Sequence, residues 1–196
     1  VTWNGTHCGS FGDVGSFSFF ADKTITTGEG GFVCTNDENV YKQLLYIRNQ
    51  GRLNRGSFEH PEIGYNFRIT DIQCAIGLTQ LKKLDTIIEK KQTILQIYKN
   101  NLHGVNGIKI IEPVGNSNHI PFRVAILFDR KITEIMNYLS NSEIETRTFF
   151  YPIHKQPCYI SCNCLKNNCS DFPNSTYVYE HGLCMPSYPD LKESEN

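Results

Sequence analysis

The 196-residue sequence lacks an excess of charge of either sign, since nineteen basic residues stand against twenty acidic ones and the net charge is −1. That balance gives no electrostatic footprint for nucleic acid or for an anionic membrane. The sequence also lacks any apolar run near the ~20 residues that span a bilayer, and it does not open on a charged-then-apolar leader. We therefore expect a cytoplasmic protein that binds neither nucleic acid nor membrane.

What the sequence does contain is an ordinary globular composition, with 39% hydrophobic and 20% charged residues. In a reducing compartment its eight cysteines should be thiols. Cys158, Cys162, Cys164 and Cys169 follow the spacing C-x3-C-x-C-x4-C, whereas zinc sites usually use C-x2-C pairs. We expect these four to form a surface loop of free thiols without metal, and the other four to be small core residues.

The first part of the chain predicts two short strands and two long helical segments. Residues 16–20 (SFSFF) and 31–35 (GFVCT) are typical of strands. Asn36 or Asp37 can cap a helix that runs to about Arg48, and the stretch 49–66 has the glycines of a loop. Apolar residues then recur at helical spacing from Thr70 to Leu102, with a break expected near Leu84. We place residues 1–84 in one domain.

The spacing of apolar residues changes after Gly104, where the second part of the chain begins. Residues 119–128 (HIPFRVAILF) and 144–150 (IETRTFF) are typical of strands, and residues 131–140 (KITEIMNYLS) predict an amphipathic helix between them. This β-α-β grouping indicates a small α/β domain. We expect it to occupy residues 85–196 together with the long helix. The chain starts with valine, and we expect it to be cut from a longer protein.

Lys23 stands between the first two predicted strands and is followed by Gly28, Gly30 and Gly31. It could be a solvated surface lysine. A phosphate-binding loop is excluded, because the glycines follow the lysine and no GK[ST] order exists. A lysine that forms a Schiff base needs a rigid support and an uncharged amine, and the surrounding phenylalanines could desolvate it. The residues alone leave the first and third interpretations open.

Four segments, in order along the chain, resemble one known family. They are GSFGDVGSFSFFADKTITTGEGG (9–31), GYNFRITDIQCAIGLTQLKKLD (64–85), IETRTFFYPIHKQPCY (144–159) and GLCMPSYPDL (182–191). They are similar to the lysine segment, the G-Y-N-x-R segment, the T-R…P-x-H segment and the closing L-P-S motif of the DegT/DnrJ/EryC1/StrS nucleotide-sugar aminotransferases. The resemblance covers nearly the whole chain.

The resemblance implies an α/β fold, namely the C-terminal portion of an aspartate-aminotransferase-like (fold type I) pyridoxal-phosphate enzyme. This portion would comprise the end of the large domain and the small domain. Lys23 matches the lysine that holds the cofactor, pyridoxal 5'-phosphate, and Ser18 matches a serine that binds its phosphate. Asn66 matches an asparagine that reaches the cofactor phosphate of the neighbouring subunit. The resemblance therefore also implies a homodimer with shared active sites.

Two further matches concern the substrate. Arg68 lies two residues after Asn66, on the same side of an extended segment, and would suit a diphosphate or a carboxylate. It could instead be a salt-bridged arginine that caps the next helix. His154 matches the family's active-site histidine near the sugar, but it could also be a structural histidine in a proline-bounded turn.

The resemblance implies transamination of a nucleotide-linked 4-keto-6-deoxyhexose to the 4-amino sugar, with glutamate as donor, in amino-sugar biosynthesis. The segment around His154 is similar to members that aminate carbon 4. The family's ring-nitrogen aspartate, its ring-stacking aromatic residue and its first phosphate loop all precede the lysine segment, so we expect these 196 residues to be inactive alone. The alternative is an inactive truncated remnant or a non-catalytic dimerising module.

Overall fold

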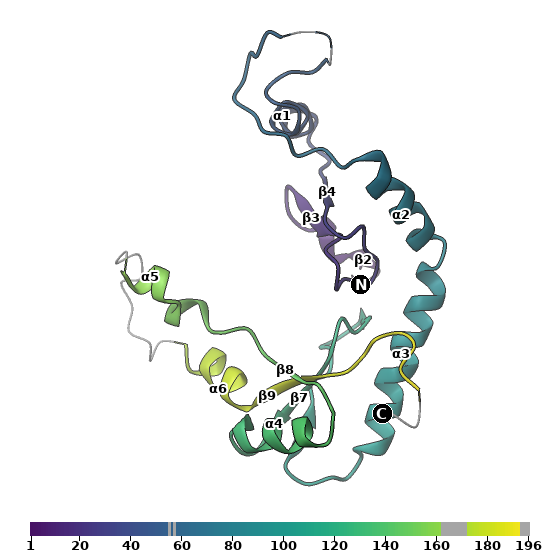
Figure 1. The fold of residues 1–196 in the computed structure, drawn as a ribbon, viewed down its shortest axis with the longest axis vertical. Coiled ribbons are helices and arrows are strands. Elements are labelled where there is room, and N and C mark those ends of the chain that lie inside the picture. Colours follow the sequence, from purple (N-terminus) through teal and green to yellow (C-terminus); the bar gives the residue numbers. More distant parts are fainter. Residues whose placement is uncertain (55, 57, 162–171, 193–196) are drawn as a thin grey trace. The chain divides into compact units, whose positions relative to one another are not determined.

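The computed structural model of the chain describes residues 1–54, 56, 58–161 and 172–192. These residues form a mixed α/β structure (Figure 1), whose contacts divide into two compact units. Unit 1 comprises Val1–Ile88 with Val114–Ile120, and unit 2 comprises Glu89–Pro113 with Pro121–Asn196. The assignment of residues 1–84 and 85–196 to two domains of a whole enzyme stays a prediction.

The hairpin of unit 1 confirms the two strands expected around Lys23. β3 (Gly15–Ser18) pairs antiparallel with β4 (Gly31–Cys34). Phe17 and Phe32 lie opposite each other, and their stacked rings have centroids 4.4 Å apart. Cross-strand aromatic pairs of this kind stabilise a hairpin. The other small strands of unit 1 pair in the order β2-β1-β6, and they are β1 (Thr2–Trp3), β2 (Thr6–His7) and β6 (Ser117–Asn118), with the 3-10 turn η1 (Cys8–Ser10) after β2.

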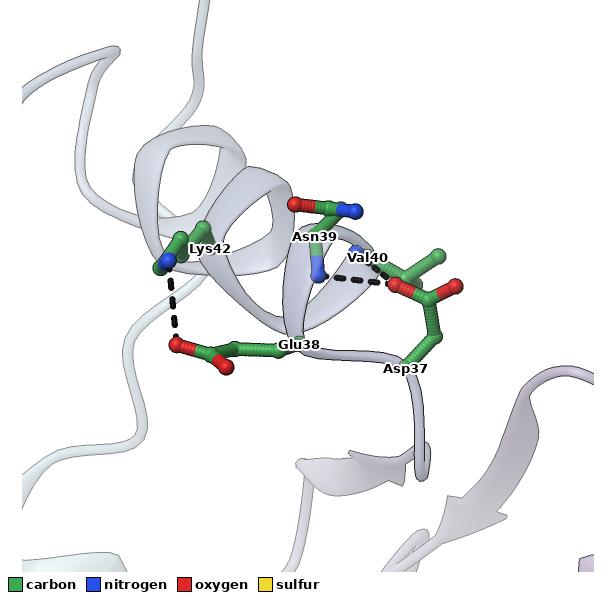
Figure 2. Close-up of polar contacts among 5 residues, drawn as sticks. All are labelled: Asp37, Glu38, Asn39, Val40 and Lys42. Carbon is green, nitrogen blue, oxygen red and sulfur yellow. Dashed lines mark hydrogen bonds and ion pairs between the residues drawn. The ribbon is translucent and has the colours of Figure 1, made fainter.

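Helix α1 (Glu38–Arg48) begins where the sequence predicts, because Asp37 caps it (Figure 2). One carboxylate oxygen of Asp37 accepts hydrogen bonds from the backbone N–H groups of Asn39 at 2.7 Å and Val40 at 3.0 Å. These bonds satisfy two of the donors that a helix leaves unpaired at its first turn. A cap of this kind contributes about 1 kcal/mol to helix stability.

The long helical stretch is divided in two, as predicted. Thr70 caps α2 (Asp71–Leu81), and its hydroxyl accepts a hydrogen bond from the backbone N–H of Gln73 at 3.3 Å. The Gln73 side chain in turn accepts the backbone N–H of Thr70 at 2.9 Å, so the pair forms a capping box. Residues 82 and 83 leave the helix, and α3 (Leu84–Asn101) begins directly after them.

The sheet of unit 2 has the order β5-β7-β9-β8, with every neighbouring pair antiparallel. Since β7 and β8 both run opposite to β9, they run in the same direction, as the predicted β-α-β grouping requires. Helix α4 joins them along the chain, and β9 lies between them (Figure 1). The elements are β5 (Ile108–Ile110), β7 (Val124–Phe128), α4 (Ile132–Asn141), β8 (Arg147–Thr148), the 3-10 turn η2 (Ile153–Lys155), α5 (Pro157–Ser161), α6 (Pro173–His181) and β9 (Gly182–Met185).

Two predicted strands are shorter than expected. The stretch 119–128 is a strand only from Val124 onward. Pro121, which precedes this strand and is fully buried, has no amide hydrogen to donate to a sheet. The stretch 144–150 is a strand only at Arg147–Thr148, which pairs along the edge of the sheet with β9.

The core of unit 2 lies between α3 and the sheet. Ile94 and Tyr98 of α3 and Val124 and Ile126 of β7 are all buried and form one hydrophobic cluster. The Tyr98 hydroxyl donates a hydrogen bond to the carbonyl oxygen of Pro186 at 3.1 Å. Burial, with a smaller effect of Tyr188, raises the pKa of Tyr98 to about 12.

Lys91 is a buried lysine in the same unit, only 6% exposed. Its Nζ donates to the carbonyl oxygens of Phe122 at 3.2 Å and Ser187 at 3.1 Å, so it joins the segments before β7 and after β9. Burial, and secondarily the positive charge of Arg123, lower the pKa of Lys91 from its usual 10.5. A neutral amine still has two N–H groups, so both hydrogen bonds survive the loss of the proton.

This lowered pKa gives a stability prediction. Between the pKa of folded Lys91 and 10.5, the unfolded chain binds more protons than the folded chain, so the free energy of unfolding should rise with pH. Cys184 and Tyr98 act in the opposite direction, because their raised folded pKa values make stability fall above about 9.0 and 10.0. We expect the free energy of unfolding of the wild type, minus that of Lys91→Met, to increase as the pH rises toward 10.5, as measured by denaturant titration. A difference that does not change with pH would contradict the prediction.

The cysteines give one correction. Cys8 and Cys34 were expected in the core, but both are exposed, and Cys74 and Cys184 are only half-buried. Cys34 ends the two-stranded hairpin, where its thiol makes a weak contact with the carbonyl oxygen of Gly9 at 3.8 Å. Of the predicted thiol loop, Cys158 is exposed on α5, and Cys162, Cys164 and Cys169 lie outside the described residues. Among the described helices, none combines the length and apolar character that a membrane crossing requires.

Candidate active site

Lys23 lies in the loop of residues 19–30 that joins β3 to β4, hereafter the lysine loop. The loop is closed at its base, because the backbone N–H of Phe19 donates to the carbonyl oxygen of Gly30 at 2.9 Å. Inside it, the N–H of Thr27 donates to the carbonyl oxygen of Phe19 at 3.0 Å, and the N–H of Lys23 donates to that of Phe20 at 3.0 Å. Lys23 is half-buried. The loop therefore offers the lysine a hydrogen-bonded support.

Two of the glycines after Lys23 stand at positions where the structure requires glycine. Gly30 has a φ of +133°, which residues with a side chain rarely adopt. At Gly31, opposite Ser18 in the hairpin, a Cβ atom would collide with the carbonyl oxygen of Phe17. The glycine-rich sequence thus closes the lysine loop tightly onto β3.

Ser18 is the last residue of β3 and is exposed at the start of the lysine loop. Its Oγ accepts a hydrogen bond from the backbone N–H of Phe20 at 3.2 Å. Since that bond uses a lone pair of the oxygen, the hydroxyl hydrogen is left to donate outward. Ser18 and Lys23 thus place a hydroxyl donor and an amine on one short segment.

Asn66 and Arg68 lie in the extended segment before α2. The N–H groups of Tyr65 and Phe67 donate to the carbonyl oxygens of Ile47 at 2.7 Å and Arg48 at 3.1 Å, so this segment pairs with the end of α1. Asn66 and Arg68 are both exposed. The alternation of the segment places them on one side, in agreement with the predicted spacing.

The two side chains touch each other. Arg68 Nε donates to Asn66 Oδ1 at 3.3 Å, which leaves the Nδ2 group of Asn66 as a donor. Thr70 supplies the side-chain cap of the following helix, and among the described residues the printed side-chain partner of Arg68 is Asn66. Ser18 and Asn66 therefore both offer donors, which is the chemistry that a phosphate group requires.

His154 belongs to unit 2, whereas the other predicted site residues belong to unit 1. It lies in η2 and is 9% exposed. Its Nε2 is 3.5 Å from the hydroxyl of Thr176, and its ring lies 4.9 Å from that of Phe172. These contacts account for its burial, and they support the structural interpretation of this residue within the chain.

Gln73 is a further residue of the site region that the motifs do not single out. Its Nε2 donates to the carbonyl oxygen of Glu29 in the lysine loop at 2.9 Å. The only sequence signal for Gln73 is the Thr-x-x-Gln spacing of a capping box at Thr70. That signal predicts the bond within the helix terminus and not the bond to a loop 44 residues earlier in the chain.

Comparison with known proteins places the whole chain in one group. The profile of the DegT/DnrJ/EryC1/StrS aminotransferase family matches residues 1–196. A GDP-perosamine synthase of Escherichia coli O157:H7 is 36% identical over 98% of this chain and 51% of its own length. A GDP-perosamine synthase of Vibrio cholerae is 35% identical over 98% of this chain and 52% of its own length. The chain thus spans about half the length of these curated relatives.

Solved structures agree with this. Helicobacter pylori PseC, an aminotransferase involved in the biosynthesis of pseudoaminic acid, superposes with a TM-score of 0.88 and 26% identity, over 99% of this chain and 53% of its own. The PLP form of the putative sugar aminotransferase Spr1654 from Streptococcus pneumoniae has a TM-score of 0.88 over 99% of this chain and 51% of its own. At 23% identity, the latter shows the fold alone.

Proposed function

The chain belongs to the DegT/DnrJ/EryC1/StrS aminotransferase family, and from this membership we propose that the full-length protein containing it transaminates a nucleotide-linked 4-keto-6-deoxyhexose. Glutamate is the proposed donor. The amino group of glutamate replaces the keto oxygen of the sugar, and the products are 2-oxoglutarate and the 4-amino sugar. The relatives named GDP-perosamine synthase make a GDP-linked sugar the first substrate to test.

The observation that carries this proposal is Lys23 on the lysine loop. The loop holds the lysine by backbone hydrogen bonds and by the close approach of Gly31 to β3, so the amine is presented from a fixed support. A lysine that reacts with a carbonyl needs such a support. A solvated surface lysine would need neither the closed loop nor the tight glycine turn.

The proposed cofactor is pyridoxal 5'-phosphate, and the donor set of the chain fits it. When bound, it supplies the electron sink for the reacting carbon. Lys23 Nζ would hold the group and, once the amino donor had released the lysine, would move the proton. The Ser18 hydroxyl would donate to a phosphate oxygen, and Asn66 Nδ2 would donate to the phosphate in the neighbouring subunit of a homodimer.

Arg68 and His154 are the proposed substrate residues. The guanidinium of Arg68 is exposed beside Asn66 and suits a diphosphate or the carboxylate of glutamate. His154 is proposed near the sugar, where its ring would be held in place by Thr176 and Phe172. The proposed role of His154 has less support than that of Arg68, because the contacts of His154 also satisfy a purely structural role.

An assay of the full-length protein tests the proposal. We expect it to release 2-oxoglutarate and the amino sugar in equal amounts when glutamate and a GDP-linked 4-keto-6-deoxyhexose are present, as measured by mass spectrometry. UDP- and dTDP-linked analogues and 3-keto sugars serve as matched comparisons. A visible absorbance band from bound cofactor should accompany activity. A purified protein with no bound cofactor and no turnover of any member of the panel would instead favour the inactive or dimerising alternative.

A further inference from the structure

The lysine loop is attached to helix α2 by a side-chain hydrogen bond and by apolar side chains. An apolar cavity of about 190 Å³ lies between them, lined among others by Phe19, Ile25, Ile69 and Leu78. Because side chains around such a space lose part of their packing contacts, the apolar faces hold the loop less firmly than a filled interface would. The loop meets the helix more directly at Thr27, whose methyl group would lie 3.0 Å from a Cβ atom at Gly77.

The polar attachment is the side chain of Gln73. Its Oε1 accepts the backbone N–H of Thr70 at 2.9 Å and the Thr70 hydroxyl at 3.0 Å. Its Nε2 donates to the carbonyl oxygen of Glu29 at 2.9 Å. Only one orientation of the amide satisfies both ends, because a backbone N–H requires an acceptor and a carbonyl requires a donor. Gln73 thus spans the gap between the first turn of α2 and the lysine loop.

The carbonyl of Glu29 is the point at which the loop is held. It accepts a second hydrogen bond, from the hydroxyl of Thr27 at 2.6 Å. Thr27 is itself buried and closes the loop through its N–H bond to Phe19. The position of the Glu29 carbonyl is therefore coupled, through Thr27 and Phe19, to the backbone that carries Lys23.

We propose that Gln73 is a positioning residue, which fixes the lysine loop to the N-terminus of α2 and thereby to the segment of Asn66 and Arg68. The significance of the link for catalysis rests on the proposed function, since it joins the segment that would hold the cofactor to the segment that would bind phosphate and substrate. The link itself is a property of the chain and can be tested without cofactor.

Gln73→Glu is the sharpest variant, because it separates the two roles of the side chain. A glutamate at this position keeps the capping box and is favourable at a helix N-terminus. It cannot donate to the Glu29 carbonyl, and its carboxylate would face that oxygen. In hydrogen–deuterium exchange of the cofactor-free full-length protein, we expect roughly fivefold to tenfold faster exchange in peptides covering residues 16–35. Exchange in the first turn of α2 should not change, because the capping box is kept.

Three controls keep the result interpretable. Gln92→Glu makes the same charge change at an exposed position of α3 and should leave the lysine loop unaffected. Thr70→Val removes the capping hydroxyl but leaves the Gln73 amide, so it should speed exchange in the first turn of α2 more than in the loop. Gln73→Met loses both roles and should loosen both segments. If Gln73→Glu does not fold, Gln73→Met is compared with Thr70→Val instead, and the loop should loosen more in Gln73→Met, because only that variant removes the bond to Glu29.

Two outcomes would overturn the proposal. Unchanged exchange of residues 16–35 in a folded Gln73→Glu protein would mean that the bond to Glu29 does not hold the loop. Equal loosening of the loop and of α2 in Gln73→Glu would also overturn it, because the effect on the loop would then follow from a disturbed helix terminus and not from the bond to Glu29. Borohydride labelling of Lys23 in the wild type is a separate readout. If the label is absent there, the proposed function fails, and the exchange result still decides the role of Gln73.

Discussion

Replacing Lys23 by alanine in the full-length protein is expected to lower kcat for transamination by about a hundredfold to ten-thousandfold, the range that a positioned proton carrier contributes. The variant loses both the amine that holds the cofactor and the group that moves the proton. Borohydride reduction of the wild-type holoenzyme should fix the cofactor to the peptide that contains Lys23. Peptide mass spectrometry measures the label, and single-turnover kinetics measures the rate.

Lys42 provides the matched control. It is exposed on α1, where it forms a 3.0 Å ion pair with Glu38 (Figure 2). An exposed pair at this helical spacing contributes only about 0.3–0.5 kcal/mol. Lys42→Ala should therefore change neither kcat nor the labelled peptide. A borohydride label on Lys42, or on any lysine other than Lys23, would refute the assignment of Lys23.

The parts of the fold that the sequence predicts are those with local causes. Asp37 stands directly before a helical pattern, and its cap depends on residues two and three positions later. The strands on both sides of Lys23 combine β-formers with glycines and pair across one loop. In each case the interaction that decides the structure lies within a few residues or within one hairpin.

The parts that the sequence does not predict depend on distant partners. β9 lies between β7 and β8 although it follows both in the chain, and nothing local to Gly182–Met185 specifies that place. A strand of four residues is too short, and this one is too uniformly apolar, to show an alternation of apolar and polar residues. The exposure of Cys8 and Cys34 likewise depends on which elements cover them and not on their own apolar character.

The candidate site divides in the same way. The i, i+2 spacing of Asn66 and Arg68 predicts that they share one side of an extended segment, and their hydrogen bond confirms it. The contact of Gln73 with Glu29 joins two motifs that are 44 residues apart, so it becomes visible only in the folded chain. Thr176 and Phe172, which contact His154, are also distant from it in sequence.

Asn66→Ala is expected to weaken cofactor binding by roughly tenfold to a hundredfold in the full-length protein. The amide group at Nδ2 would donate a charge-assisted hydrogen bond to a phosphate oxygen, worth on the order of 1.5–3 kcal/mol. Each 1.4 kcal/mol corresponds to about a factor of ten in the dissociation constant. Titration of the apoprotein with cofactor, followed by absorbance, measures the change. Asn39→Ala on the exposed start of α1 is a suitable control, because only its backbone N–H is used by Asp37.

The sharper test asks in which subunit Asn66 acts. Full-length Lys23→Ala and Asn66→Ala proteins are mixed under conditions that allow subunits to exchange. If Asn66 serves the neighbouring subunit, each heterodimer contains one site in which both residues are intact, and activity should return to about a quarter of the wild-type value once half of the dimers are mixed. The assay uses a cofactor concentration too low to occupy the Asn66→Ala sites. If Asn66 serves its own subunit, every site lacks one residue and the mixture is no more active than the separate variants. Heterodimers proven by mass spectrometry but without recovered activity would exclude the shared-site proposal for this protein, because no other placement of Asn66 leaves both residues in one site of a heterodimer.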